Sequence, residues 1–336
     1  MIETSEEKKL LSLGFLGVGW IGRNRMEAIL KHSHAEADII VEPGEENAAE
    51  ALKTAPGARL EASYSSMLDE MLDGIVIATP SAMHADQSIA ALKSGKAVFC
   101  QKPLGRTAEE VKEVVKASKD ADRLLAVDLS YRKVRAFEEI QRLVSSKEIG
   151  DIFAVDLVFH NAYGPDKEWF YDFSRAGGGC VMDLGVHLVD YVLWCLGFPE
   201  IRDVNSSLFY KGRNLQEQEE QVEDYASVSM TSAEGTLINM QCSWHISAGQ
   251  DAVIEARFYG TKGGAAVKNV NGSFYDFTAE KYQGTQKEIL ISAPDDWGGR
   301  TGVEWAEKLL AGNRYDANTA AELIKTAEII DRIYGR

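Results

Sequence analysis

The residues that are best suited to catalysis, by type and by spacing, follow a run of glycines at 177–179. Asp183, His187 and Asp190 are spaced i, i+4 and i+7, so a helix would place them on one face. They lie beside an apolar stripe formed by Val181, Leu184, Leu188, Val192 and Cys195. Burying carboxylates and an imidazole there is costly without partners or a function, although a solvated helix face is the usual alternative. Because imidazole titrates near neutral pH, we expect His187 to donate or accept a proton.

A lysine at the end of a predicted strand is the second candidate for chemistry. Lys102 follows the apolar segment 97–100, and open α/β sheets bind their ligands outside the carboxyl ends of their strands. An ammonium group directed at a reacting oxygen would stabilise negative charge that develops there. A solvated surface lysine is the alternative. Pro103 fixes the backbone directly after Lys102.

A glycine-rich loop near the N-terminus has the spacing of a dinucleotide-binding motif. The pattern G-x-G-x-x-G starts at Gly17, between a predicted strand at 11–16 and a predicted helix at 20–31. The first glycine permits a tight turn, the second lets a pyrophosphate approach the backbone, and the third lets helix and strand pack closely. The helix N-terminus adds N–H donors and a positive dipole end. We expect the cofactor to contact Gly17, Gly19, Trp20, Ile21 and Gly22.

An acidic residue after the second predicted strand indicates which dinucleotide is bound. Glu42 lies 20 residues beyond Gly22, where a carboxylate normally binds the ribose 2′-hydroxyl. A carboxylate there would repel a 2′-phosphate, so Glu42 predicts NAD rather than NADP. Glu45 and Glu46 are the alternatives if the loop register differs, and a solvent-facing acid is a further one.

The surrounding elements predict an α/β protein with two domains. In residues 1–128 short apolar runs alternate with helical patterns, which is typical of a doubly wound parallel sheet, the Rossmann arrangement. Residues 129–336 open with a helix and then contain mostly strands between 201 and 292. We therefore expect a second α/β domain with a large, mostly antiparallel sheet, and two helices at the end of the chain.

Composition limits the classes of function. The chain has 336 residues, 45% of them hydrophobic, and a formal charge of −16, which disfavours nucleic-acid or anionic-membrane binding. It has no apolar run of roughly 18–20 residues and no apolar segment in its first nine residues, so we expect a cytoplasmic protein. The four cysteines form no C-x-x-C pair, which argues against a metal cage or a disulfide framework.

Three further segments, together with the glycine loop, resemble the glucose–fructose oxidoreductase/inositol dehydrogenase (Gfo/Idh/MocA) family. Residues 78–84 are similar to the family's T-P-x-x-x-H, residues 95–104 to G-K-x-V-x-x-E-K-P-L, and residues 177–187 to G-G-G-x-x-x-D-x-G-x-H. The resemblance covers nearly the whole chain. It implies a Rossmann domain, a second domain whose open sheet often forms homodimers or homotetramers, and a nicotinamide in the cleft between the domains.

The resemblance also implies a reaction and roles for particular residues. Members mostly oxidise or reduce a carbon–oxygen bond of a sugar, a cyclitol or a related small molecule. Lys102, Asp183 and His187 would be catalytic: His187 takes or gives the proton, and Asp183 binds substrate hydroxyls. Thr79, Pro80 and His84 would border the cofactor, which Lys102 also contacts.

Other residues are candidates for substrate binding on chemical grounds. Recognition of a polyol needs hydrogen-bonding groups and an aromatic wall, and the segment before the glycine run supplies both. The candidates, besides Lys102, Asp183 and His187, are Arg132, Asn161, Tyr163 and Trp169. An ordered loop that packs on the sheet is the alternative for this segment.

One position departs from the family pattern. Gln101 stands where the family has glutamate before the lysine, so a negative charge is missing beside Lys102. This change either tunes the lysine or marks a protein that binds cofactor without ordinary turnover. Two alternatives to a dehydrogenase therefore stay open: an enzyme that uses NAD for transient oxidation in an elimination or glycoside hydrolysis, and a dinucleotide-binding regulator.

Overall fold

The computed structural model describes residues 9–215 and 221–336, which divide into two compact units. Unit 1 contains the described part of Met1–Leu104 together with Lys112–Ser130 and Gly298–Ala320. Unit 2 contains Gly105–Val111, the described part of Tyr131–Trp297, and Ala321–Arg336. Each unit has its own sheet and its own hydrophobic core.

Unit 1 is a parallel, doubly wound sheet with the order β3-β2-β1-β4-β5-β6. Its strands are β1 Leu11–Leu16, β2 Ala35–Val41, β3 Arg59–Leu60, β4 Gly74–Ile77, β5 Ala97–Cys100 and β6 Leu125–Val127. Its helices are α1 Trp20–His32, α2 Glu45–Thr54, α3 Tyr64–Asp69, α4 Ser81–Lys93, part of α5 Ala108–Ala121, and α9 Arg300–Ala311. Every residue of β4 and β5 is buried, as expected for parallel strands covered on both faces. The predicted Rossmann arrangement is confirmed.

The strand order of unit 1 reverses between β1 and β4. Ligands of open α/β sheets bind outside the carboxyl ends of the strands at such a switch point. The loops that begin at Gly17, after β1, and at Ala78, after β4, are adjacent, because a Cβ atom added to Gly17 would lie 2.7 Å from the carbonyl oxygen of Ala78. The predicted cofactor loop therefore starts at this switch point.

Unit 2 contains a nine-stranded sheet with the order β15-β14-β13-β12-β7-β11-β10-β8-β9. Its strands are β7 Ile152–Asn161, β8 Ile201–Tyr210, β9 Arg213–Asn214, β10 Tyr225–Ser232, β11 Leu237–Ser243, β12 Ala252–Gly260, β13 Gly263–Asn269, β14 Phe277–Gln283 and β15 Gln286–Ile291. The pairing of β11 with β7 is parallel and the others are antiparallel, so the predicted mostly antiparallel sheet is confirmed.

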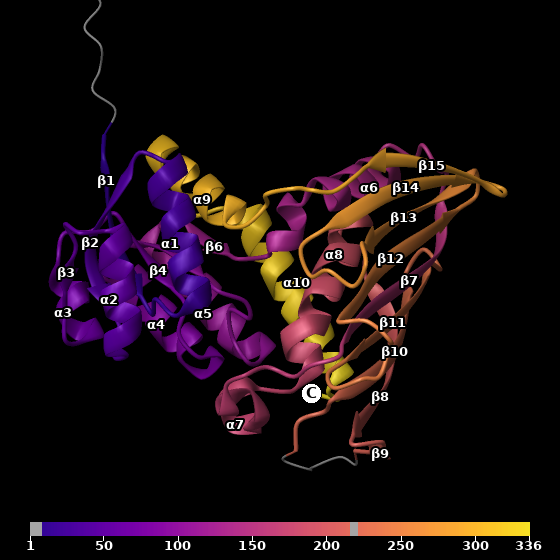
Figure 1. The fold of residues 1–336 in the computed structure, drawn as a ribbon, viewed down its shortest axis with the longest axis horizontal. Coiled ribbons are helices and arrows are strands. Elements are labelled where there is room, and N and C mark those ends of the chain that lie inside the picture. Colours follow the sequence, from indigo (N-terminus) through magenta and orange to yellow (C-terminus); the bar gives the residue numbers. More distant parts are fainter. Residues whose placement is uncertain (1–8, 216–220) are drawn as a thin grey trace, which may run out of the picture. The chain divides into compact units, whose positions relative to one another are not determined.

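Helices cover one face of this sheet. The remaining helical segments are η1 Ser130–Lys133, α6 Arg135–Ser145, η2 Glu168–Tyr171, α7 Phe173–Ala176, η3 Val181–Gly185, α8 Val186–Cys195 and α10 Ala317–Ile333. The first residues of α10 belong to unit 1. In the described part of unit 2, α6 and α8 lie on the same side of the sheet, and no helix lies on the other side (Figure 1). Alternate residues of β10 are buried, beginning with Ala226, Val228 and Met230, which is typical of a sheet with one covered face.

The structure refines the sequence prediction at several elements. The segment 298–320, predicted to lie with the second domain, packs on unit 1, where the ring of Trp305 lies 5.8 Å from that of Phe99. Strand β13 was not predicted, because its glycines and alanines have low strand propensity. The last helix begins at Ala317, where Asp316 accepts the backbone N–H groups of Asn318 and Thr319.

None of the helices in the described part of the chain is both long and apolar enough to cross a membrane. All four cysteines are unpaired and buried.

Candidate functional site

The glycine loop in unit 1 has the geometry of a phosphate-binding turn. Gly17 has φ +80°, a conformation that side chains rarely adopt, and a Cβ atom on Gly22 would lie 2.2 Å from the carbonyl oxygen of Gly17. A Cβ atom on Gly19 would meet nothing within 4 Å, so the loop opens to free space there. Gly19 also caps α1 without a side-chain hydrogen bond, and the first turn contains no acid. The loop therefore suits the diphosphate of a dinucleotide, with Trp20 (64% exposed) and half-buried Ile21 beside it.

Glu42 is held against this loop. Its carboxylate accepts a hydrogen bond from the backbone N–H of Val18 at 2.8 Å and one from Gly44 at 2.9 Å. The side chain is half-buried. Glu45 and Glu46, the alternative acids, lie in the first turn of α2 and are exposed. Of these acids, Glu42 is thus the one bound to the glycine loop, and each of its oxygens keeps a lone pair for a ribose hydroxyl.

The loops after β4 and β5 are joined by His84. Its Nδ1 lies 2.6 Å from the carbonyl oxygen of Pro103 and its Nε2 lies 2.6 Å from that of Thr79. The ring is buried, so its observed contacts are with these backbone segments, and a direct contact with a cofactor stays a prediction. Half-buried Lys102 directly precedes Pro103, and the bond between them is cis. His84 thereby fixes the backbone that carries Lys102. Thr79 is tied in turn to α4 through a 2.6 Å hydrogen bond to Gln87, and Pro80 caps that helix.

The buried position of His84 predicts a pH dependence of stability. Burial, assisted by the charge of Lys102, lowers the pKa of His84 below its ordinary value of 6.5, against the effect of the two carbonyl groups. The unfolded chain therefore binds a proton at this residue before the folded chain does, and stability falls as the pH drops below about 6.5. We expect the free energy of unfolding of wild type to fall relative to that of His84→Gln between pH 7.5 and pH 5, measured by urea denaturation.

An exposed histidine supplies the control for this measurement. His32 lies at the end of α1 and is exposed, so the difference between wild type and His32→Asn should stay constant over the same range. A constant difference for His84→Gln as well would contradict the assigned role of the buried ring.

In unit 2, Asp183 and His187 lie together on a segment that is otherwise buried. From Cys180 to Leu193 they are the two residues with partly exposed side chains. The predicted single helix is divided here, because Val181–Gly185 forms a π-helical turn and α8 begins at Val186. Such turns are frequent at functional sites. An acid and an imidazole are therefore the polar groups that reach solvent from this apolar segment.

The glycine run before this segment is explained by a buried acid that sequence reasoning missed. The carboxylate of Glu223 accepts hydrogen bonds from the backbone N–H of Gly179 (2.9 Å) and Val181 (2.8 Å) and from the hydroxyl of Tyr334 (2.8 Å). A Cβ atom on Gly179 would lie 2.0 Å from the Glu223 carbonyl oxygen, and one on Gly178 would lie 2.0 Å from the Tyr334 hydroxyl. Only glycine permits these approaches, which fix the start of the Asp183 segment.

Aromatic side chains surround the Asp183–His187 pair. The indole N–H of Trp244 donates to Oδ2 of Asp183 at 3.1 Å, and the ring of Tyr131 lies 4.9 Å from that of His187. Burial raises the pKa of both Tyr131 and Tyr171, and the charge of Asp183 adds to the effect on each. The ring of Tyr171 lies 5.6 Å from that of Trp244. Sequence reasoning missed Trp244 because its partner is 61 residues away in the chain.

Arg132 and Asp190 bind each other in the structure. The guanidinium of Arg132 binds both oxygens of Asp190, at 2.9 and 2.6 Å, and binds Glu322 at 2.5 Å. Asp190 is buried, whereas Asp183 and His187 are partly exposed, although the i, i+7 spacing predicted one shared face. The ion pairs hold the pKa of Arg132 above its ordinary value despite burial. We infer that Arg132 anchors α8 and α10, and substrate binding by Arg132 stays a prediction.

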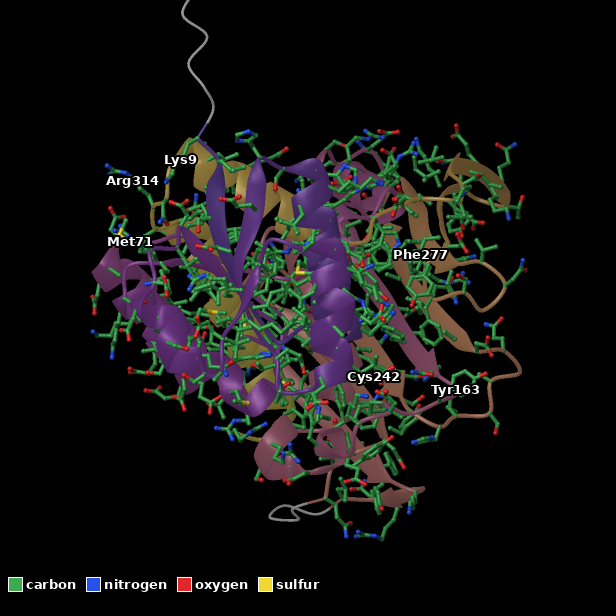
Figure 2. All side chains as sticks on the ribbon, turned by 60° about the vertical axis from the view of Figure 1, so that its left-hand side comes forward. Lys9, Met71, Tyr163, Cys242, Phe277 and Arg314 are labelled. Carbon is green, nitrogen blue, oxygen red and sulfur yellow. The ribbon has the colours of Figure 1, made fainter. Side chains whose placement is uncertain are left out.

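The remaining predicted substrate residues occupy the loop after β7. The side chain of Asn161 accepts the backbone N–H of Tyr163 at 2.8 Å, and the hydroxyl of Tyr163 donates to Asp251 at 2.7 Å. Tyr163 is exposed and lies at the outer edge of the unit (Figure 2). The ring of Trp169 stacks on Phe170 with centroids 3.8 Å apart. The loop is thus ordered by its own contacts, and its part in binding substrate stays a prediction.

Both units match domains of one protein family. A sequence model of the Gfo/Idh/MocA oxidoreductase family, describing its NAD-binding Rossmann fold, matches residues 11–129, and a model of the family's C-terminal domain matches residues 137–266. Among similar proteins, levoglucosan dehydrogenase of Pseudarthrobacter phenanthrenivorans is 29% identical over 59% of this chain and 54% of its own. Inositol 2-dehydrogenase of Rhizobium meliloti is 26% identical over 76% of this chain and 75% of its own.

Other relatives match over a shorter range, and solved structures share the fold. The chain spans 54–58% of the length of three curated relatives, which include 1,5-anhydro-D-fructose reductase of Ensifer adhaerens (27% identical over 54% of this chain). A levoglucosan dehydrogenase complex with NADH and levoglucosan superposes with a TM-score of 0.81 at 23% identity, over 96% of both chains. A 3-ketoreductase from Actinomadura kijaniata in complex with NADP superposes with a TM-score of 0.83 at 16% identity, over 97% of both chains.

Proposed function

Because this chain belongs to the Gfo/Idh/MocA family of oxidoreductases, we propose that it transfers a hydride between NAD and a carbon–oxygen centre of a sugar, a cyclitol or a sugar-derived acid. The observation that carries this proposal is the pair Asp183 and His187, which share the partly exposed part of an otherwise buried segment. The glycine loop supports the choice of cofactor, because Gly17, Gly19 and Gly22 meet the steric needs of a bound dinucleotide.

Three side chains have separate roles in the proposed reaction. When bound, NAD supplies the ring that accepts or donates the hydride. His187 accepts the hydroxyl proton during oxidation and returns it during reduction, which is a task that suits imidazole. Lys102 stabilises negative charge that develops during the reaction with its ammonium group. Asp183, oriented by the Trp244 indole at 3.1 Å, accepts hydrogen bonds from substrate hydroxyls.

The names of the relatives support a polyhydroxylated substrate. Inositol and levoglucosan appear in the names of two similar enzymes. We propose that Trp169, Tyr163 and Asn161 contribute an aromatic wall and hydrogen-bonding groups for such a molecule. The aromatic rings around Asp183 and His187 support the same class of substrate.

The carboxylate of Glu42 predicts a preference for NAD over NADP. We expect NAD to bind at least about tenfold more tightly than NADP, because Glu42 is fixed at the glycine loop and would repel a 2′-phosphate. Glu42→Gln should reduce this ratio, since the amide keeps the size of the side chain and removes its charge. Quenching of protein fluorescence by each nucleotide measures both constants. Exposed Glu45→Gln is the matched control, and tighter binding of NADP to wild type would refute the assignment of Glu42.

A panel of substrates tests the proposed reaction. Purified protein is mixed with NAD and, in turn, with inositols, levoglucosan, glucosides and sugar acids, while NADH absorbance and product are followed together. We expect NADH to form in step with product for at least one compound. Product without net NADH would instead indicate elimination or hydrolysis through transient oxidation. Binding of NAD with no reaction on any compound would indicate a regulator. Either of these results would overturn the proposal.

We also propose that the open face of the unit 2 sheet forms a homodimer or homotetramer. Large apolar side chains are exposed along it: Leu237 of β11 and Tyr259 of β12 both pair with Ala154 of β7, so they point to the same side. Light scattering of the purified protein measures the mass, and a monomer at micromolar concentration would contradict this arrangement.

A further inference from the structure

The departure at Gln101 is accompanied by a buried acid elsewhere in unit 1. We propose that Asp128 is a positioning residue, which fixes the segment of Lys102 relative to the helix that follows the glycine loop. Gln101 must then be neutral, because Asp128 carries the negative charge of the cluster. This inference rests on the proposed function only for the roles of Lys102 and the glycine loop.

Asp128 binds three elements of unit 1 at once. It follows β6 and is 1% exposed. Its Oδ2 accepts the side-chain amide of Gln101 at 2.7 Å and Nε of Arg25 at 2.5 Å. Its Oδ1 accepts the hydroxyl of Thr301. Gln101 follows β5, Arg25 belongs to α1, and Thr301 belongs to α9. One carboxylate therefore connects the helix of the glycine loop to the end of the strand that leads to Lys102.

The charges in this cluster balance only if residue 101 is neutral. Asp128 is paired with one buried guanidinium, that of Arg25. Although burial opposes ionisation, the charge of Arg25 and the hydrogen bonds from Thr301, Arg25 and Gln101 hold the pKa of Asp128 below its ordinary value. A glutamate at 101 would bring a second carboxylate within hydrogen-bond distance of the first. Two carboxylates that share a buried site repel, and one of them must bind a proton. The glutamine amide instead donates a hydrogen bond to the acid.

The geometry of Gln101 connects the cluster to Lys102. The backbone N–H of Gln101 bonds to the carbonyl of Ile77 at 2.9 Å, so Gln101 continues the ladder beyond the end of β5. Gln101 is buried against Asp128, while the next residue, Lys102, is half-buried. Because the two residues are adjacent, fixing the side chain of Gln101 also fixes the backbone that carries Lys102.

Variants at position 101 separate charge from shape. Gln101→Met removes the hydrogen bond without adding charge, whereas Gln101→Glu adds the repelling carboxylate. We expect Gln101→Glu to bind NAD at least about fivefold more weakly than Gln101→Met at pH 8 and to unfold at lower urea concentration. The difference should shrink at pH 5, where a carboxyl group of the pair is protonated. Nucleotide binding is measured by fluorescence quenching, so the comparison needs no turnover.

A double variant tests whether a carboxylate at position 101 can replace the one at position 128. Asp128→Asn leaves Arg25 without its carboxylate, and Gln101→Glu/Asp128→Asn returns one carboxylate to the same cluster. We expect the double variant to bind NAD about tenfold more tightly than either single variant. Its kcat should recover as well, while the KM for the sugar or cyclitol substrate changes little. If Asp128→Asn does not fold, the comparison of Gln101→Glu with Gln101→Met still tests the inference. Equal behaviour of those two variants, or an additive double variant, would overturn the inference. Failure of wild type to bind NAD would instead overturn the proposed function.

Discussion

Lys102→Met is expected to lower kcat by about 10²–10³-fold, the usual loss when one group that stabilises developing charge is removed. Methionine keeps most of the length of the side chain and removes the ammonium. NAD should still bind, because the glycine loop, Glu42 and the His84 contacts are unchanged by this substitution. Initial rates of NADH formation at saturating substrate give kcat, and fluorescence quenching gives the NAD affinity.

An exposed lysine of the same unit provides the matched control. Lys93 ends α4 and is exposed, so Lys93→Met should keep the wild-type kcat and NAD affinity. The account fails for Lys102 if Lys102→Met retains more than about a tenth of the wild-type kcat. It also fails if the loss arises from weaker substrate or cofactor binding with kcat unchanged, because such a residue stabilises bound ligand rather than the transition state.

His187→Asn is expected to lower kcat by about 10²–10⁴-fold, the range that a positioned general base contributes. Asparagine preserves a hydrogen-bonding group of similar reach and cannot take up the proton. In the oxidation direction the wild-type rate should fall as pH is lowered, because a protonated imidazole accepts no further proton. That acidic limb should be absent from the residual activity of His187→Asn.

The pH profile distinguishes proton transfer from a structural role. His32→Asn, at an exposed position, should keep the wild-type rate and the acidic limb. An acidic limb that persists unchanged in His187→Asn would assign proton transfer to another group, whatever the size of the loss in kcat.

The fold was predictable where burial determines the sequence pattern. The strands β1 and β5 are short apolar runs because parallel strands are covered on both faces, and both were predicted at their observed bounds. The helix α6 was predictable from the spacing of its apolar residues. By contrast, β3 has two residues, both exposed, so it leaves no pattern. The return of 298–320 to unit 1 depends on a tertiary contact of Trp305 that no local rule contains.

The candidate site was predictable in its motifs but not in their partners. Glycine positions, Lys102, Asp183 and His187 were identified from local spacing and from the family resemblance. Their partners lie far away in sequence: Glu223 is 44 residues from Gly179, and Asp128 is 27 residues from Gln101. Asp190 lies in α8 with His187 but is buried and bound by Arg132. Spacing in the sequence indicates which residues can share a helix face, but it does not show which of them has a partner from another segment.

The central claim is that Lys102 and His187 both act on the hydride-transfer step that we propose, and a double-variant cycle tests it most directly. The kcat/KM values of Lys102→Met, His187→Asn and the combined variant are measured on the best substrate of the panel. The effects of substituting residues that act together in one step are strongly non-additive. The combined variant should therefore lose little more activity than the worse single variant. Losses that multiply, so that the combined variant falls by the product of the two single effects, would show that the two residues act independently and would contradict the account.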